Sequence, residues 1–320
     1  MARALVTGGA GFIGSHVAER FLEAGYEVVV MDDLSRGSRE NVPAAASLEE
    51  LDVRSPEAAA LVTQGAFDVI AHLAAQIDVR RSVEDPSYDV DVNVRGTLNL
   101  IEPLRRDGAR TRVVFASTGG ALYGDGAAPP TPETYPKDPE APYGIAKLAA
   151  EYYLAYYARV HGLDTVAVRF GNVYGPRQDP HGEAGVVAIF CDRVLRGRAL
   201  TVYGDGTQTR DYVYVTDVAE GIFRAATSEL PAPGRLDARA FNIGTAVETS
   251  VLELAELLLA AAGVDTPVEF APRRAGEVQR SCIDVERAAS VLGWRPTVEL
   301  ADGLARTFAW ASGRQAAARA

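Results

Sequence analysis

The amino-acid sequence predicts an α/β protein built on a doubly wound parallel sheet, with a smaller, discontinuous α/β portion beside it. Three observations support this fold class. Short apolar runs alternate with helical periodicity through the first half, a glycine-rich turn follows the first apolar run, and acidic or small polar residues end several later runs. Such alternation produces parallel sheets covered on both faces, which bind ligands at the carboxyl ends of their strands.

The predicted elements of the first half follow one another in the order that a parallel sheet requires. Apolar runs predict strands over residues 2–6, 27–31, 67–72, 113–116 and 165–170, and a short third strand that ends at residues 51–53. Helical periodicity predicts helices over residues 13–24, 87–106 and 143–161. The motifs described below fall at the ends of these strands or open the helices that follow.

Composition and charge exclude several function classes. The 320 residues are 48% hydrophobic and 23% charged, which is ordinary for a globular protein with a large core. A net charge of −11 argues against nucleic acid or an anionic membrane as partner. The two cysteines, Cys191 and Cys282, cannot form a disulfide framework or a cysteine-rich zinc site, and we expect no metal. We see neither a signal-peptide core nor a bilayer-spanning stretch, so the cytoplasm is the expected location.

The stretch from Thr7 to Gly14 predicts a dinucleotide site and makes the sheet Rossmann-type. It follows a strand, opens a helix, and has an acid about 20 residues downstream. Gly8 permits the tight turn, Gly11 lets a pyrophosphate approach the helix N-terminus, and Gly14 allows close packing of helix and strand. Asp32 would hold the adenosine ribose hydroxyls and repel a 2′-phosphate, which favours NAD over NADP; its other reading is a simple turn residue.

Further residues are expected to contact the dinucleotide. Asp52 and Val53 could bracket the adenine, and the small residues after His72 offer a surface for the cofactor. His72 itself is expected to be a packed core histidine. The remaining candidates lie beside these motifs: Phe12, Ile13, Asp33, Leu73, Ala74, Ala75, Asn93, Ser117, Tyr143, Lys147 and Phe170.

Tyr143 and Lys147 are spaced i and i+4 in a predicted helix, and so lie on one face. A phenol that acts as a base at neutral pH needs a pKa about 3 units below its usual ~10, roughly 4 kcal/mol. One cation ~5 Å away supplies about 3 kcal/mol at an effective dielectric of ~20. Lys147 and an oxidised nicotinamide, which is itself cationic, would together suffice. The sequence therefore predicts a hydroxyl acid/base beside the dinucleotide.

After Gly171 the pattern changes, and Pro, Gly and Tyr become frequent. Helices are predicted over residues 186–196 and 251–262, and a strand at residues 241–244 is expected to return to the main sheet. We therefore expect residues 1–170 to form the NAD-binding Rossmann domain, completed by the strand near 240–244. Residues 171–320 would mainly form a discontinuous substrate-binding domain.

The chain resembles the extended short-chain dehydrogenase/reductase family, and within it the UDP-glucose 4-epimerases. The resemblance covers almost the whole sequence. It rests on TGGAGFIGSH, DDLSRG, HLAAQIDVRRSVEDP, NVRGTLNLIE, ASTGGALYG, YGIAK, GNVYGPRQDPHGEAG, TRDYVYVTDVAEG and RRAGE. The first motif and the YxxxK motif are general to the superfamily. The glycine pair in STGGALYG and the GNVYGPRQDPHGEAG block point to bacterial nucleotide-sugar epimerases.

The resemblance implies a role for each member of the catalytic set. Tyr143 would take the proton of the sugar 4-hydroxyl, and Lys147 would hold the nicotinamide ribose and depress the pKa of Tyr143. Thr118 would bridge the sugar hydroxyl and the phenol, with Ser117 as the alternative, because this run aligns ambiguously with longer serine runs in relatives. NAD would stay bound and be neither consumed nor released.

The resemblance also implies a UDP-sugar site. Asn172 would contact a phosphate or the sugar, and Val187, Thr201 and Tyr203 would line the uracil. The remaining positions are two diphosphate clamps, Arg210 and Arg274, and a ribose contact, Glu277. Two Arg residues in an acidic protein suit a dianionic pyrophosphate.

Ser281 departs from part of the family pattern. It stands four residues after Glu277, where a bulky Tyr excludes N-acetylated sugars in relatives. Since Ser is small, the pocket is expected to admit UDP-N-acetylglucosamine as well as UDP-glucose.

Three other functions remain open from the sequence. Related dehydratases and UDP-glucuronate decarboxylases place acidic residues after the catalytic Ser/Thr, where this chain has Gly119 and Gly120, so elimination is disfavoured. Epimerisation of UDP-glucuronate or a UDP-pentose needs the same C4 chemistry. A non-catalytic NAD-binding sensor would have no need of Thr118, Tyr143 and Lys147.

A homodimer is expected from two predicted helices, residues 87–106 and 143–161. Their apolar positions extend beyond one core face and include Tyr152, Tyr153, Tyr156 and Tyr157. Relatives pair these helices across a dimer interface, although an extra-wide core face would look similar.

Overall fold

Seven parallel strands form the central sheet of the computed structural model, which describes residues 1–107, 110–181, 185–273 and 278–319. In spatial order they are β11 (Ala240–Ile243), β6 (Asp164–Phe170), β5 (Arg112–Thr118), β4 (Val69–His72), β1 (Arg3–Thr7), β2 (Glu27–Asp32) and β3 (Ser47–Glu50). The order reverses between β1 and β4, where doubly wound sheets bind their ligands. The expected fold class is confirmed.

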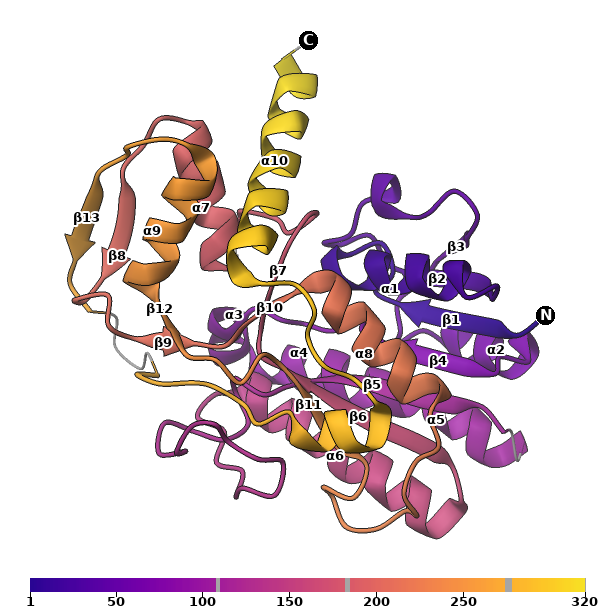
Figure 1. Cartoon of the computed structure of the whole chain (residues 1–320). Helices are drawn as coiled ribbons and strands as arrows, with labels where there is room; N and C mark the ends of the chain where they lie inside the picture. Colours follow the sequence, from indigo (N-terminus) through magenta and orange to yellow (C-terminus); the bar gives the residue numbers. More distant parts are fainter. Residues whose placement is uncertain (108–109, 182–184, 274–277, 320) are drawn as a thin grey trace.

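Helices cover both faces of this sheet (Figure 1). On one face lie α1 (Phe12–Glu23) and α8 (Val215–Thr227), and on the other α2 (Pro56–Gly65), α5 (Gly96–Asp107) and α6 (Pro142–His161). Alternation along β1 explains the two layers. Ala4 and Val6 join the core beneath α1 and α8, whereas Leu5 joins the core beneath the other three helices.

The second portion has a core of its own. It contains three two-stranded sheets and three helices. The strand pairs are β7 (Asn172–Tyr174) with β10 (Tyr212–Tyr214), β8 (Leu200–Tyr203) with β13 (Val268–Ala271), and β9 (Thr209–Arg210) with β12 (Thr249–Ser250); the helices are α7 (Val186–Leu195), α9 (Val251–Ala262) and α10 (Leu300–Arg319). The strand β11 leaves this portion and pairs with β6 in the main sheet.

The segment predicted as one helix over residues 87–106 is divided. It consists of α4 (Pro86–Val90), a π-helical turn η2 (Asp91–Arg95) and α5. Apolar periodicity cannot reveal a single widened turn, which often lies near functional sites. The shorter remaining elements are α3 (Val79–Glu84), η1 (Arg39–Asn41) and η3 (Ala288–Leu292).

A buried ion pair attaches α6 to the sheet. Arg169 on β6 has no exposed surface, and Glu151 on α6 is 2% exposed. The Arg169 Nη2 lies 2.6 Å from Glu151 Oε2 and 2.9 Å from Asp237 Oδ1. The other guanidinium nitrogens donate to Glu151, to the Glu133 carbonyl and to the Tyr123 hydroxyl. The charge of Arg169 is therefore compensated and fully hydrogen-bonded.

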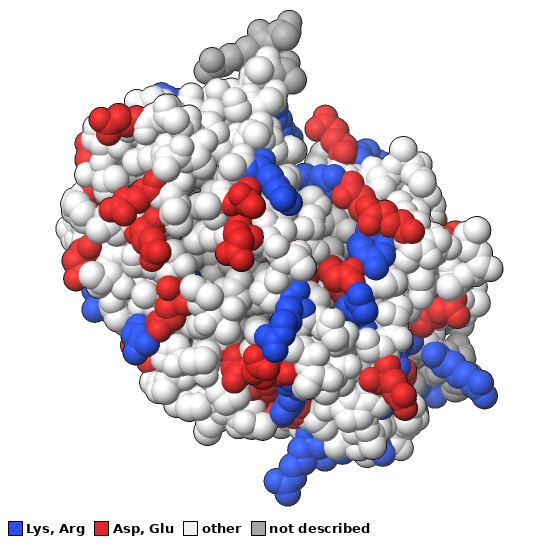
Figure 2. Space-filling model, viewed as in Figure 1, with Lys and Arg blue, Asp and Glu red and all other residues white. Residues whose placement is uncertain are grey.

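Charges of both signs are interspersed on the face shown in Figure 2, where acidic side chains separate the basic ones. Among the described helices, none combines the length and the apolar composition that crossing a bilayer requires.

Removal of Glu151 tests the buried pair. Glu151→Ala leaves Arg169 buried with only part of its compensation, and the free energy of unfolding should fall by about 3 kcal/mol in denaturant titrations. Glu286→Ala is the control, since it breaks the Glu286–Arg295 pair, in which both side chains are more than half exposed. Equal losses in the two variants would contradict the role given to Glu151.

Candidate active site

The glycine-rich turn between β1 and α1 has the close approaches that require glycine. Gly8 has a φ of +70°, and its backbone N–H donates to the Met31 carbonyl on β2. A Cβ on Gly14 would lie 2.1 Å from the Gly8 oxygen, too close for any side chain. The first turn of α1 therefore packs directly against the end of β1, as the spacing predicts.

The N-terminus of α1 offers hydrogen-bond donors to a ligand. Gly11 is its N-cap and provides no side-chain acceptor for the first backbone N–H groups. Unsatisfied N–H groups and the positive end of the helix dipole favour an anion at this position. The diphosphate of a dinucleotide fits this site.

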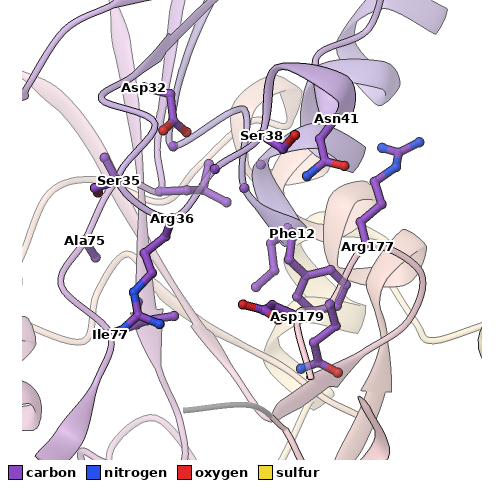
Figure 3. A pocket seen from close by; sticks show the side chains of 18 of the residues that line it. Phe12, Asp32, Ser35, Arg36, Ser38, Asn41, Ala75, Ile77, Arg177 and Asp179 are labelled. Carbon is purple, nitrogen blue, oxygen red and sulfur yellow. The ribbon is translucent and has the colours of Figure 1, made fainter. Parts of the chain in front are cut away.

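A cavity of about 880 Å³ opens at the carboxyl ends of the strands. Sixteen of the seventeen residues expected to contact the cofactor line it. They are Gly8, Gly11, Phe12, Ile13, Gly14, Asp32, Asp33, Asp52, Val53, Leu73, Ala74, Ala75, Ser117, Tyr143, Lys147 and Phe170. In Figure 3, Ser35, Arg36, Ala75 and Ile77 lie along one side of the pocket, and Phe12, Arg177 and Asp179 along the other.

Asn93 is the remaining cofactor candidate, and it does not line the cavity. It is buried on η2, where its side chain forms a reciprocal pair with the backbone of Gln76: Gln76 N donates to Asn93 Oδ1, and Asn93 Nδ2 donates to the Gln76 oxygen, both at 2.9 Å. Gln76 does line the cavity. Asn93 thus supports the loop after β4.

Asp32 at the end of β2 connects the glycine-rich turn to the following loop. Its Oδ2 accepts from the Ala10 N–H at 3.0 Å, and its Oδ1 accepts from the Leu34 N–H at 2.9 Å. Burial raises the pKa of Asp32, and the two backbone hydrogen bonds act in the opposite direction. The neighbouring Asp33 accepts from the backbone and hydroxyl of Ser35. The turn-forming role and a contact with a ribose are both compatible with this geometry.

His72 is buried, as expected. Its ring nitrogens lie 2.7 Å from Thr7 Oγ1 and 3.0 Å from Thr97 Oγ1, and burial lowers its pKa to about 3. It is a neutral core residue that connects β1, β4 and α5.

Tyr143 and Lys147 lie in the first turns of α6 and line the inner end of the cavity. The Lys147 Nζ donates to the Ala116 carbonyl at 3.0 Å, and it lies 6.0 Å from the Tyr143 ring centroid. The Tyr143 N–H donates to Ser82 Oγ. The two side chains therefore form one polar unit at the end of β5.

The electrostatics of this pair differ from the sequence expectation. Burial lowers the pKa of Lys147 to about 8, while the charges of Asp89 and Glu151 raise it. Burial raises the pKa of Tyr143, and the charge of Asp89 raises it further. The expected depression of the Tyr143 pKa by Lys147 is thus not met by the protein alone, because burial and the charge of Asp89 both raise this pKa.

Ser117 and Thr118 end β5 in different environments. Ser117 lines the cavity, and its buried Oγ has no hydrogen-bond partner among the described residues. Thr118 Oγ1 accepts from the Ala121 N–H at 3.2 Å and lies outside the residues that line the cavity. An unsatisfied buried hydroxyl in the cavity wall indicates that a ligand atom would complete the hydrogen bonding of Ser117.

The candidates for substrate binding lie in the second portion, beyond this cavity. A Cβ placed on Gly120 would be 4.0 Å from both Asn172 Oδ1 and Ser281 Oγ, so these three residues border one space next to Thr118. Val187 is buried on α7, Thr201 and Tyr203 lie on β8, and Arg210 lies on β9 beside the strand-like segment of Ser281. Arg274 and Glu277 lie outside the described residues.

Several lining residues were not identified from the sequence. Four of them lie within two motifs on which the family resemblance rests, DDLSRG and GNVYGPRQDPHGEAG, and these motifs could have identified them: Ser35, Arg36, Arg177 and Gln178. No local sequence pattern indicates that residues of α7 and α10 line the cavity, because this depends on how helices far apart in the sequence pack together. These lining residues are Ala188, Cys191, Asp192, Leu195, Arg196, Thr307, Trp310, Ala311, Arg314 and Gln315.

Comparisons with known proteins agree with this geometry. A UDP-glucose 4-epimerase of Mycolicibacterium smegmatis is 47% identical over 310 residues, which cover 95% of this chain and 97% of the relative. The structure of a UDP-glucose 4-epimerase from Thermotoga maritima with UDP-glucose is 42% identical, with a TM-score of 0.91 and coverage of 98% and 99%. The Thermus thermophilus UDP-glucose 4-epimerase in complex with NAD is 44% identical, with a TM-score of 0.88 and coverage of 97% and 99%.

A family model matches residues 4–244, which include the glycine-rich turn, the Tyr143–Lys147 pair and the returning strand β11. The chain therefore belongs to the NAD dependent epimerase/dehydratase family.

Proposed function

We infer that this protein is an isomerase that catalyses the NAD-dependent 4-epimerisation of a UDP-hexose through a transient 4-keto sugar. The observation that carries this inference is the Tyr143–Lys147 pair in the wall of a cavity that is also lined by the glycine-rich turn. Identities of 41% to 47% with UDP-glucose 4-epimerases over almost the whole chain support the substrate class.

The residues of the cavity fit a nicotinamide dinucleotide. The uncapped N-terminus of α1 suits its diphosphate, Asp32 and Asp33 end β2 beside the position of a ribose, and the unsatisfied Ser117 Oγ faces the inner end. A bound NAD would supply the acceptor for a hydride from sugar C4 and the donor that returns it to the opposite face of the keto sugar. We propose that the dinucleotide remains bound between turnovers.

Proton transfer is assigned to Tyr143. Its phenolate would take the proton of the sugar 4-hydroxyl as the hydride departs, and return it when the sugar is reduced again. Lys147, held by the Ala116 carbonyl, places a fixed ammonium beside the phenol. Thr118 would bridge the sugar hydroxyl and the phenol, and Ser117 is the alternative. The buried Oγ of Ser117 has no partner among the described residues, which supports a contact between Ser117 and the cofactor.

The sugar is proposed to occupy the space bordered by Gly120, Asn172 and Ser281. We propose that residues 171–320, without β11, bind the nucleotide. In this assignment Val187, Thr201 and Tyr203 would surround the uracil, Arg210 and Arg274 would neutralise the diphosphate, and Glu277 would contact the ribose.

Two features disfavour elimination chemistry: the acidic residue that it needs is absent from the sequence, and there is little room for one at Gly119. A Cβ on Gly119 would lie 3.0 Å from two carbons of Ile283 and from the Phe170 oxygen. The acidic side chain that a dehydratase places after the catalytic Ser/Thr would therefore require Ile283 or the Phe170 backbone to shift at this position. Epimerisation, which needs no such acid, suits Gly119.

A homodimer is proposed from the exposed face of α6. Ile145, Tyr152, Tyr153, Tyr156 and Val160 are each at least 42% exposed there, an unusual density of apolar side chains for one helix. The cytoplasm remains the expected compartment on the sequence observations alone.

Tyr143→Phe tests the base. Without the phenolic oxygen, conversion of UDP-glucose to its C4 epimer should fall by at least about 10³-fold, because no other group accepts the hydroxyl proton. The assay is chromatographic separation of the epimers without added NAD. Tyr152→Phe, which removes an exposed hydroxyl from the same helix, is the control and should keep full activity. Full activity in Tyr143→Phe would refute the assignment.

Ser281→Tyr tests the width of the sugar space. The wild type should convert both UDP-glucose and UDP-N-acetylglucosamine. The variant should lose about 100-fold in rate on the N-acetylated sugar and little on UDP-glucose, since a ring at residue 281 fills the space of the acetamido group. Ser281→Thr is the matched control. If wild type and Ser281→Tyr exclude the N-acetylated sugar equally, residue 281 does not set specificity.

The combined variant Tyr152→Glu/Tyr156→Glu tests the dimer. Charges on this face should convert a dimeric protein to monomers in analytical ultracentrifugation, because buried unpaired carboxylates are costly. Val264→Glu, an exposed apolar position after α9, should leave the assembly unchanged. A monomeric wild type would end the proposal.

A further inference from the structure

Asp89 is a buried carboxylate for which the reaction described above has no role. It lies on α4 and has no exposed surface. Gln76 Nε2 and Asn93 Nδ2 both donate to its Oδ1, at 2.9 Å and 3.1 Å. Its Oδ2 is buried and has no hydrogen-bond partner among the described residues. A buried carboxylate with one free oxygen is costly and calls for an explanation.

The surroundings of Asp89 connect it to the catalytic helix. The short helix α4 packs against α6, which carries Tyr143 and Lys147, and also against α3 and η2. The other charged groups near it have partners of their own. Arg81 of α3 stacks over Tyr88, and Asp91 of η2 pairs with Arg54 and Arg95.

On α6, Glu151 is neutralised by Arg169. Among the described residues, neither Asp89 nor Lys147 forms a salt bridge, whereas Asp91 and Glu151 do. Burial raises the pKa of Asp89 and lowers the pKa of Lys147, and in each case the charge of the other group opposes the shift.

Asp89 also supports the cofactor side of the cavity. The Gln76 side chain that donates to Asp89 also donates to the Asp78 carbonyl, and its Oε1 accepts from the Asp78 N–H. Gln76 is in turn held at its backbone by Asn93. One carboxylate thus fixes two amide side chains, which together determine the course of the loop after β4.

We propose that Asp89 is a positioning residue for the epimerisation, whose buried carboxylate serves as the counter-charge that keeps Lys147 protonated and, through Gln76 and Asn93, fixes the loop of residues 73–78 beneath the dinucleotide. This role rests on the proposed function of Tyr143 and Lys147. It has a cost, because the same negative charge opposes ionisation of Tyr143.

The two effects give a signature that a structural role would not produce. Neutralising Asp89 lowers the pKa of Lys147 and the pKa of Tyr143 together. If activity requires ionised Tyr143 and protonated Lys147, the acidic and the alkaline limbs of the pH–rate profile both move to lower pH. Loss of packing alone would reduce the rate and leave the limbs in place.

The composition of the chain allows a direct measurement. Lys137 and Lys147 are its only two lysines, against 30 arginines. Protein labelled with lysine isotopically enriched at Cε therefore gives two lysine signals in NMR, and Lys137→Arg assigns them. The titration midpoint of Lys147 can be read in the holoenzyme without substrate and without turnover.

The test compares Asp89→Asn with Asp85→Asn. Asn at residue 89 keeps an oxygen acceptor for Gln76 and Asn93 but removes the charge. Asp85 is an exposed N-cap on the same helix, and Asn preserves capping. In Asp89→Asn the Lys147 midpoint should fall by about one pH unit, which corresponds to the loss of a charge–charge interaction of roughly 1.4 kcal/mol. Both limbs of the kcat profile should shift likewise, and Asp85→Asn should match the wild type.

An unchanged Lys147 midpoint in folded Asp89→Asn would overturn the proposal, whatever the activity. Should that variant fail to fold, Asp89→Ser removes the same charge with a smaller side chain and is read in the same way. Failure of both neutral variants to fold would assign Asp89 to the core rather than to the reaction. Since the midpoint needs no turnover, a protein without epimerase activity would refute the proposed function and still decide the role of Asp89.

Discussion

The buried pair between Arg169 and Glu151 is the constraint on which the site depends. It joins the last long strand of the sheet to the helix that carries Tyr143 and Lys147, at a place where both partners are buried. One turn away from Glu151, Lys147 donates to the end of β5, and one turn further Tyr143 is held by Ser82. The helix is thus fixed at three successive turns against three different elements. Such a pair adds little net stability compared with apolar packing, but it permits only one register of α6 on the sheet.

The burial that orders Tyr143 and Lys147 also works against their charges. Desolvation disfavours the charged form of both groups. It therefore raises the pKa of Tyr143 and lowers the pKa of Lys147. For the ammonium, the charges of Asp89 and Glu151 offset part of this effect. They do not do so for the phenolate, whose stabilisation must come from positive charge brought in with the ligand. The chemistry is therefore coupled to occupancy of the cavity, and the free protein would be a poor base.

Local patterns predicted the fold class and sixteen of the residues that line the cavity, since each depends on residues close in sequence. The glycine spacing, Asp32 after β2 and the i, i+4 pair of Tyr143 and Lys147 are of this kind. The π-turn at Asp91–Arg95, the supporting place of Asn93 and the lining by Trp310 could not be predicted in this way. They arise from contacts between segments far apart in sequence, which periodicity does not record. The raised pKa of Tyr143 was missed for a related reason, because spacing gives the neighbouring cation but not the loss of water.

The returning strand β11 has a consequence for how this chain matures. Its partner edge on β6 is complete at Phe170, but β11 begins only at Ala240, so the open edge must persist while residues 171–239 are synthesised. Open edges invite pairing with other chains, and contacts of long sequence separation form slowly. During translation, the nascent sheet thus carries a transient aggregation hazard that disappears only once the chain has emerged from the ribosome as far as Ile243.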